Sequence, residues 1–253
     1  MQKYVERIGK SLAGKPNFSI PDVAIRPVSR IVRDLTNIPQ ANWWRYAFSR
    51  EPMNGRFCDE ERQDMYQQAV ACGERYAQAC QEQYGTIPME ELAEKLGLDL
   101  VFQDRPQSSS RIVFADFQEP GTIHVYEDGL EKGEALLAQP DVKNAFGCDV
   151  DIASVLIAHE LFHVLELRDP AIWTRTHSVV LWKAGWFTNR SPVAVLSEIA
   201  AMAFAKRMTG LPFSPYVLDA FLVYGYSESA SSALYEEMSQ AAQPPASGFK
   251  PQA

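Results

Sequence analysis

The sequence contains no long apolar run and few cysteines. No stretch approaches the roughly eighteen uncharged apolar residues of a membrane-spanning helix, and the N-terminal residues contain no apolar segment typical of signal peptides. The four cysteines form no Cys-x-x-Cys pair, so their spacing suggests neither a disulfide framework nor a zinc knuckle. We therefore expect free thiols in a reducing compartment, and a soluble cytoplasmic protein without a membrane partner.

Positive charge is scarce over most of the chain. The formal net charge is -8, which does not suit a protein that coats nucleic acid or anionic lipid. Residues 1–56 carry ten Lys and Arg against four Asp and Glu, a balance of +6, so the remainder carries -14. This basic segment could dock on the acidic body of the protein or on an acidic partner. It shows no nucleic-acid-binding motif, so nucleic acid is not an expected partner.

The remaining composition is that of a globular protein. Hydrophobic residues make up 46% of the 253 residues and charged residues 22%, which allows one substantial core with a smaller helical lobe. The residue patterns predict a mainly helical N-terminal extension over residues 1–85, a main domain over 86–240 and a flexible tail over 241–253.

The main domain alternates helical and strand-like patterns. A long helix is predicted just before it, over residues 59–84, where apolar side chains recur at helical spacing. A short helix follows Pro88 and ends at Gly97. Three strand-like segments and another short helix come next, at residues 98–104, 111–117, 122–128 and 130–138. A small sheet packed on helices defines an α+β fold.

The main chemical signal is the motif His-Glu-Leu-Phe-His, which begins at His159. It lies in an apolar run preceded by two suitable N-cap residues, Asp149 and Asp151, and this pattern predicts a buried helix. Residues four apart on a helix differ by about 40° of rotation and about 6 Å of rise. The imidazoles of His159 and His163 can therefore bind one metal ion from the same face. The alternative is a pair of hydrogen-bonded core histidines.

Glu160 is the candidate general base. It lies about 100° around the helix from His159, within reach of a water molecule on the same ion. Zinc lowers the pKa of bound water to about 7, and a nearby carboxylate can take its proton as the water attacks a carbonyl. These residue types predict a zinc-dependent peptidase with Zn²⁺ as its cofactor and a peptide or protein as its substrate.

A catalytic zinc ion needs a third protein ligand. Asp169 lies six residues after His163, but no glycine precedes it to turn the chain back toward the metal. Glu198 is the better candidate, because it is an acidic residue in an apolar helix predicted to start at Ser191-Pro192. His177 is a weaker alternative, in a connection expected to be mobile.

Other polar residues could support the reaction. Donors to the oxyanion could come from His177, Tyr224, Tyr226 or Arg175, each with a structural role as the alternative. Glu166 and Asp169 could be partners of a ligand imidazole, or could form a solvated helix end. The strand at 122–128 could offer an edge to an extended peptide. Its His124 is expected to be packed or solvated rather than catalytic.

The chain resembles the ImmA/IrrE family of metallopeptidases over about residues 86–210. The similarity comprises His-Glu-Leu-x-His, here His159–His163, followed by Glu-x-x-Ala-x-x-Phe-Ala, here Glu198, Ala201, Phe204 and Ala205. It implies a zincin-like metallopeptidase core, zinc bound by His159, His163 and Glu198, and Glu160 as general base. Members of the family cleave or inactivate helix-turn-helix repressors, so the resemblance also implies a transcriptional repressor as partner.

Two other functions remain open at this point. The protein could be a non-catalytic regulator that binds a partner and uses a metal only as a structural site. A structural zinc site is closed by four protein ligands, whereas a catalytic site keeps one position for water. The protein could also be a peptidase for short peptides or cell-wall fragments, which a cytoplasmic location disfavours.

Overall fold

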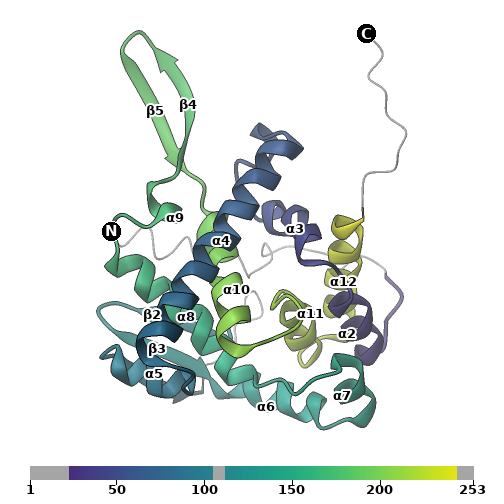
Figure 1. Cartoon of the computed structure of the whole chain (residues 1–253). Helices are drawn as coiled ribbons and strands as arrows, with labels where there is room; N and C mark the ends of the chain where they lie inside the picture. The colour runs from purple at the N-terminus through teal and green to yellow at the C-terminus, as the bar shows by residue number, and fades with distance from the viewer. Residues whose placement is uncertain (1–22, 105–111, 244–253) are drawn as a thin grey trace, which may run out of the picture.

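The computed structural model describes residues 23–104 and 112–243, and it shows a mixed α+β fold (Figure 1). Nearly all of the tail predicted from residue 241 lies outside these ranges. In the described ranges the α-helices are α2 (Val28–Thr36), α3 (Trp44–Ser49), α4 (Asp59–Tyr84), α5 (Met89–Lys95), α6 (Glu127–Leu137), α7 (Pro140–Phe146), α8 (Ile152–Arg168), α9 (Trp173–Thr176), α10 (Val195–Thr209), α11 (Val217–Tyr224) and α12 (Glu228–Ala242). The strands are β1 (Asp99–Gln103), β2 (Ala115–Gln118), β3 (Thr122–Tyr126), β4 (Ser178–Ala184) and β5 (Phe187–Pro192).

Helix α4 forms over the residues that its apolar spacing predicts. At its start, the Glu61 carboxylate accepts the backbone N–H of Cys58 at 2.9 Å, as in a capping box. It ends at Gly85, whose φ of 79° is readily adopted only by glycine. The helix packs along α10 (Figure 1). At their closest approach, a Cβ on Gly73 would lie 2.0 Å from the carbonyl oxygen of Ala200, so only glycine allows this contact.

Strands β1, β2 and β3 form a small sheet in the order β1-β3-β2. β1 runs parallel to β3, with Asp99 opposite Thr122, and β2 runs antiparallel to β3. The prediction that the strand at 122–128 offers an edge to a peptide is therefore wrong, because β3 is hydrogen bonded on both sides. β2 stands at one edge of the three strands and lies against α8.

Helix α10 starts later than predicted. Ser191 and Pro192, the expected first residues, belong to β5, and the helix begins at Val195. The group that holds its N-terminus comes from far away in the sequence. The buried carboxylate of Glu51 accepts the backbone N–H of Val195 at 3.1 Å and that of Met53 at 3.1 Å. A distant acidic side chain therefore replaces the local cap that the sequence seemed to offer.

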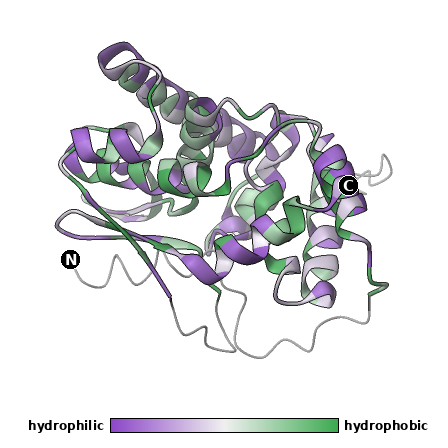
Figure 2. Cartoon of the chain, turned by 90° about the horizontal axis from the view of Figure 1, so that it is seen from below, coloured by the Kyte–Doolittle hydropathy of each residue, from purple (hydrophilic) through white to green (hydrophobic). Residues whose placement is uncertain are grey.

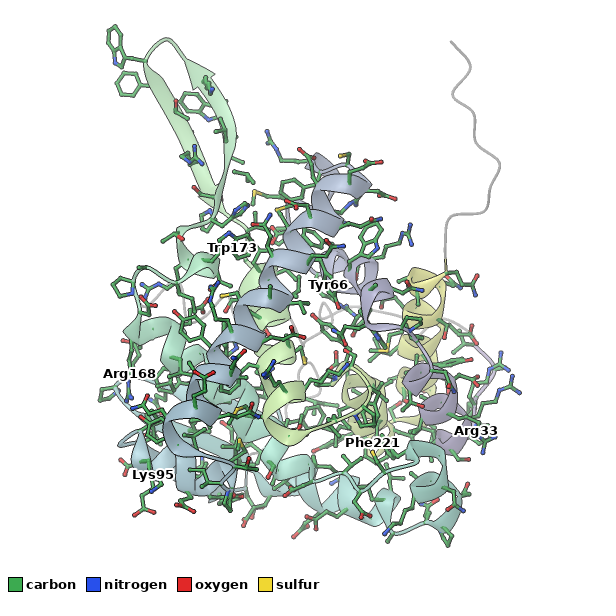
Figure 3. All side chains as sticks on the ribbon, viewed as in Figure 1. Arg33, Tyr66, Lys95, Arg168, Trp173 and Phe221 are labelled. Carbon is green, nitrogen blue, oxygen red and sulfur yellow. The ribbon has the colours of Figure 1, made fainter. Side chains whose placement is uncertain are left out.

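The connection between α8 and α10 is folded. The short helix α9 is followed by β4 and β5, which pair antiparallel into a hairpin that projects from the body (Figure 1). Gly185, with a φ of 58°, follows Ala184 at the turn. A two-residue hairpin turn favours glycine at this position because the backbone needs a positive φ. The labelled Trp173 of α9 lies near the base of the hairpin (Figure 3).

One hydrophobic core contains residues from α2 through to α12. The hydrophobic colour in Figure 2 gathers where the helices meet, and hydrophilic residues cover the outside. In Figure 3, Phe221 lies within the body, while Arg33, Lys95 and Arg168 lie at its periphery. The N-terminal helices therefore share their buried surface with α8 and α10. None of the described helices is long and apolar enough to cross a membrane.

Candidate metal centre

Helix α8 places both histidines of the motif on one face. Asp151, one of the two predicted N-caps, accepts the backbone N–H of Ser154 at 3.0 Å and its hydroxyl at 2.8 Å. The helix then continues to Arg168, so the motif lies well inside it. Because the helix is apolar on nearly all sides, its polar side chains must find partners within the core.

His159, His163 and Glu198 converge at one point between α8 and α10. The two imidazole Nε2 atoms lie 3.2 Å apart. Glu198 Oε2 lies 3.4 Å from His159 Nε2, and Glu198 Oε1 lies 3.8 Å from His163 Nε2. All three residues are buried. Their ligand atoms lie within 4.8 Å of one another, and no other such group of three occurs among the residues that the structure describes.

These distances fit a tetrahedral divalent ion. Zinc binds imidazole nitrogen at about 2.0–2.1 Å and carboxylate oxygen at about 2.0–2.2 Å, which puts two ligand atoms of one tetrahedron about 3.3 Å apart. Two of the three observed separations are close to this value, and the His163–Glu198 separation is slightly longer. The buried group can therefore hold a metal ion, with a fourth position left for water or substrate.

A second layer of buried polar groups holds His163. Its Nδ1 lies 3.2 Å from the Ser197 hydroxyl, which in turn donates to Glu166 Oε2 at 2.6 Å. The Thr174 hydroxyl donates to the other oxygen of Glu166. Because the Ser197 proton goes to Glu166, the Ser197 oxygen can only accept from His163 Nδ1–H. This leaves the lone pair of Nε2 for an ion. Glu166 is thus a buried partner of the His163 imidazole through Ser197, and not a solvated helix end.

The charges of the centre favour a cation. Burial acts to lower the pKa of His163, but the carboxylates of Glu166 and Glu198 outweigh it and raise the pKa to about 9. Burial acts to raise the pKa of Glu198, but the hydrogen bond from His159 and the charge of His163 bring it below its usual value. Positive charge between these residues is therefore stabilised, and a divalent ion would replace the imidazole proton.

The carboxylate of Glu160 is half-buried beside the centre. Burial raises its pKa, the two histidines partly oppose this, and the charges of Glu198 and Asp116 add to the rise. A carboxylate with a raised pKa is a stronger proton acceptor than an ordinary one. The surroundings of Glu160 therefore suit the role of a general base.

The geometry of this centre is the basis for assigning a function. Comparisons with protein-family models, curated proteins and solved structures find no match to the chain. The chemical possibilities consequently follow from the donor set itself, two imidazoles and a carboxylate, and from the additional carboxylate of Glu160.

Three other candidates lie outside the cluster. The Asp169 carboxylate accepts the hydroxyl of Tyr76 and the backbone N–H of Ala171, so it closes the end of α8. The Arg175 guanidinium donates to two carbonyl oxygens in the last turn of α8, at 3.1 and 2.9 Å. His124 contacts two glutamine side chains of the sheet, as a packed histidine would.

The other three candidate oxyanion donors, His177, Tyr224 and Tyr226, are not among the residues whose ligand atoms converge. His177 follows α9, its ring centroid lies 4.7 Å from that of Trp173, and burial lowers its pKa. Its Nε2 is buried without a hydrogen-bond partner among the described residues. Tyr224 ends α11, and the Tyr226 hydroxyl donates to Asp128 at 2.6 Å. Their roles in catalysis stay predictions.

Two polar residues near the centre, the buried Tyr216 and the half-buried Asp219, were not among the predicted ones. Tyr216 has a hydroxyl without a hydrogen-bond partner in the described part of the chain, and its ring stacks on Trp43 at a centroid distance of 5.6 Å. Asp219 accepts the Tyr46 hydroxyl at 3.0 Å. Their sequence signal is a Tyr and an Asp three residues apart, a pattern too common to mark a site.

Asp219 makes the stability depend on pH. Burial raises the pKa of its carboxyl from 3.8 to about 6, against the hydrogen bond from Tyr46 and the charge of Arg50. The folded protein thus binds this proton more tightly than the unfolded chain. Ionisation of Asp219 therefore costs stability progressively as the pH rises from about 4 to about 6, and the full cost remains at higher pH.

We expect the Asp219→Asn variant, which cannot ionise, to unfold a few degrees higher than wild type at pH 7 when both are free of metal. Below about pH 3, where the wild-type carboxyl is protonated in both the folded and the unfolded state, this advantage should vanish. The unfolding temperatures of the variant and of wild type, monitored by circular dichroism at the two pH values, check this expectation. An equal shift at both values would contradict the ionisation argument.

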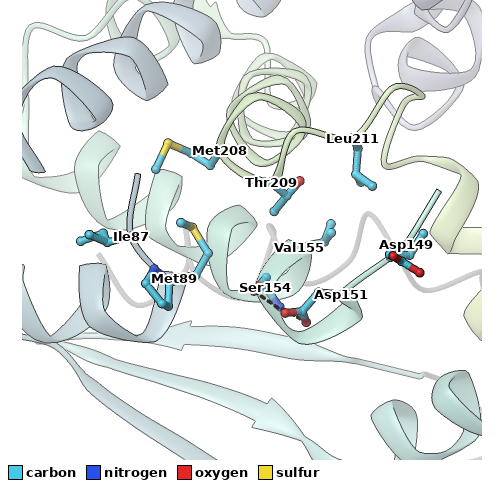
Figure 4. A pocket seen from close by; sticks show the side chains of 11 residues that line it. Ile87, Met89, Asp149, Asp151, Ser154, Val155, Met208, Thr209 and Leu211 are labelled. Carbon is cyan, nitrogen blue, oxygen red and sulfur yellow. Dashed lines mark hydrogen bonds between the residues drawn. The ribbon is translucent and has the colours of Figure 1, made fainter. Parts of the chain in front are cut away.

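A hollow of about 330 Å³ lies at the other end of the same two helices (Figure 4). Its lining includes Asp151 and Ser154 at the start of α8, Met208 and Thr209 at the end of α10, and Met89 of α5. The metal centre uses the second half of α8 and the first turn of α10. The two helices are therefore antiparallel, and the hollow is separate from the centre.

Proposed function

We propose that the protein is a zinc-dependent peptidase with a zincin-like core, in which His159, His163 and Glu198 hold the ion and Glu160 is the general base. The convergence of two imidazoles and a carboxylate on one point between two buried helices carries this proposal. Two histidines and a glutamate form the ligand set of several catalytic zinc sites in peptidases.

Each residue of the centre has a part in the proposed hydrolysis. Zinc, when bound, polarises the scissile carbonyl and makes a water molecule more acidic. Glu160 accepts a proton from the attacking water and returns it to the leaving amine. Ser197 and Glu166 keep His163 in the tautomer whose Nε2 is free, so the ligand geometry is set before substrate binds.

The substrate we infer is a peptide or protein in the cytoplasm, and the resemblance to ImmA/IrrE peptidases suggests a helix-turn-helix repressor. The residues that carry this resemblance occur together in the fold. Ala201, Phe204 and Ala205 are fully buried on the helix that supplies Glu198, next to the helix that supplies the histidines. The residues of the shared motif therefore lie on one packed pair of helices, α8 and α10, and the proposed metal ligands lie between these two helices.

Metal analysis of the purified chain tests this function against a purely structural metal site. We expect about one zinc ion per chain, removed by dialysis against a chelator. Cleavage of a quenched fluorescent peptide library should stop on chelation and return when one equivalent of Zn²⁺ is added. Tightly bound zinc without cleavage of the library or of an unfolded protein such as casein would favour the regulatory alternative.

A further inference from the structure

The tip of the β4–β5 hairpin exposes large aromatic side chains that the metal centre does not use. Trp186 is 89% exposed, Phe187 64% and Trp182 53%. The ring centroids of Trp186 and Phe187 lie 5.8 Å apart, so they form one apolar surface at the turn. Exposed aromatic groups that adjoin one another are typical of an interaction surface, because their burial releases much free energy.

The hairpin is linked to the body through β4 and is free at its tip. The Arg56 guanidinium donates to the carbonyl oxygen of Leu181, in the middle of β4, at 2.9 Å. The Arg190 guanidinium donates to the hydroxyl and carbonyl oxygens of Ser178, which joins the two strands of the hairpin to each other. In the described part of the chain, β4 and β5 pair only with each other. A ribbon of two strands is only marginally stable on its own. A partner at the tip would therefore bury surface that the protein itself leaves open.

The segment that contains the hairpin is cationic, although the protein as a whole is acidic. Residues 178–192, which form the hairpin, include two basic residues, Lys183 and Arg190, and no acidic residue, whereas the whole chain carries -8. Lys183 lies next to the turn, in the strand pair with Thr188. A partner that offers negative charge together with a place for aromatic rings would match both features of this surface.

We propose that the hairpin tip binds the surface of a membrane that contains anionic lipids. Trp186 and Phe187 insert at the level of the headgroups, where aromatic rings are favoured, and Lys183 lies among the lipid phosphates. Exposure is greatest at the turn, which is the part of a projecting hairpin that meets a flat partner first. A polypeptide that added a strand would instead use the edges of β4 or β5 along their length.

This proposal departs from the expectation that lipid is not a partner, which rested on the charge of the whole chain. The total of -8 hides a local excess of positive charge on one projecting element. Exposed charges separated by more than about 8 Å are largely screened at physiological salt, so the attraction of the tip to an anionic surface depends on the charges near the tip. Because the hairpin leads directly into α10, binding would also bring the metal centre to the membrane surface.

Sedimentation of the full chain with lipid vesicles tests the proposal. We expect binding to phosphatidylcholine vesicles that contain about one third phosphatidylglycerol, and binding at least about tenfold weaker to phosphatidylcholine alone. The double variant W186S/F187S should lose about tenfold or more in affinity for the anionic vesicles. Lys183→Glu should weaken binding to anionic vesicles only. Phe102→Ser, which removes a 42% exposed aromatic ring from β1, is the matched control and should bind like wild type.

Circular dichroism of each variant shows whether the fold is kept. A wild-type protein that stays in the supernatant with both kinds of vesicle would overturn the proposal, as would a double variant that binds anionic vesicles as tightly as Phe102→Ser. Binding to polyglutamate but not to vesicles would assign the tip to an acidic polypeptide and equally overturn it. The assay needs neither metal nor hydrolysis, so its outcome is independent of the peptidase proposal.

Discussion

The Glu160→Gln variant is expected to hydrolyse peptides about 10²–10⁴-fold more slowly than wild type while keeping its zinc. The amide has nearly the shape of the carboxylate but cannot accept a proton from water. Glu160 is not among the three groups whose ligand atoms converge, so the ion should not depend on it. Loss of the half-buried Glu160 charge, which its surroundings already disfavour by raising its pKa, should not destabilise the fold.

Three measurements check this expectation together. The zinc content of the variant is determined after dialysis, its cleavage rate is measured with the peptide library, and its unfolding temperature is compared with wild type. Glu131→Gln, which neutralises an exposed carboxylate on α6, should retain full activity. Wild-type activity in the Glu160→Gln protein would exclude Glu160 as the base, whereas loss of zinc would show that it supports the ion.

The Glu198→Ala variant is expected to bind zinc more than about 100-fold more weakly, and to lose hydrolysis with it. Changes one layer behind a ligand already lower metal affinity 10–100-fold, so removal of one of three ligands should do more. The deletion also removes the carboxylate that stabilises positive charge beside His163. Two imidazoles alone would remain to hold the ion.

Competition with a zinc-binding dye gives the affinity of the Glu198→Ala protein. Asp219→Asn is the matched control, because it removes a half-buried carboxylate near the centre that lies outside the ligand group. The control should keep wild-type affinity. Unchanged zinc affinity in Glu198→Ala would mean that a different residue completes the centre, and the proposed ligand set would have to be abandoned.

The two histidines of the centre could be predicted from the sequence because they are only four residues apart. His159 and His163 must share a face once the segment is helical, and an apolar run behind a good N-cap ensured the helix. Glu198 could be recognised for a different reason. An acidic residue in an otherwise apolar helix needs a partner in the core, and the structure shows it facing both imidazoles.

Features that depend on distant residues could not be predicted. The predicted start of α10 is wrong because Ser191-Pro192 has the local pattern of a helix start, whereas the first N–H group of the helix, that of Val195, donates to the distant Glu51. The order of the strands in the sheet, β1-β3-β2, could not be predicted from the sequence either. A parallel pair of β1 with β3 depends on how the chain crosses over between them, and no local pattern specifies that.

The hairpin between α8 and α10 did have a local signal. β-branched and aromatic residues flank a glycine, as Val179, Val180 and Trp182 precede Gly185 and Phe187 follows it. The register slips at Leu181, where a bulge interrupts the pairing, and this breaks the regular alternation by which a strand is recognised. Tyr216 and Asp219 had no such signal, because only the tertiary fold brings them near Glu198.

The contact at Gly73 has a consequence for the metal centre. There the backbones of α4 and α10 touch with no side chain between them, so the two helices cannot shift separately at that point. Glu198 is on the turn of α10 just before Ala200, the residue that Gly73 touches. A side chain at position 73 would push α10 away from α4 at Ala200. Such a displacement would also change the distance from the Glu198 carboxylate to the two imidazoles on α8.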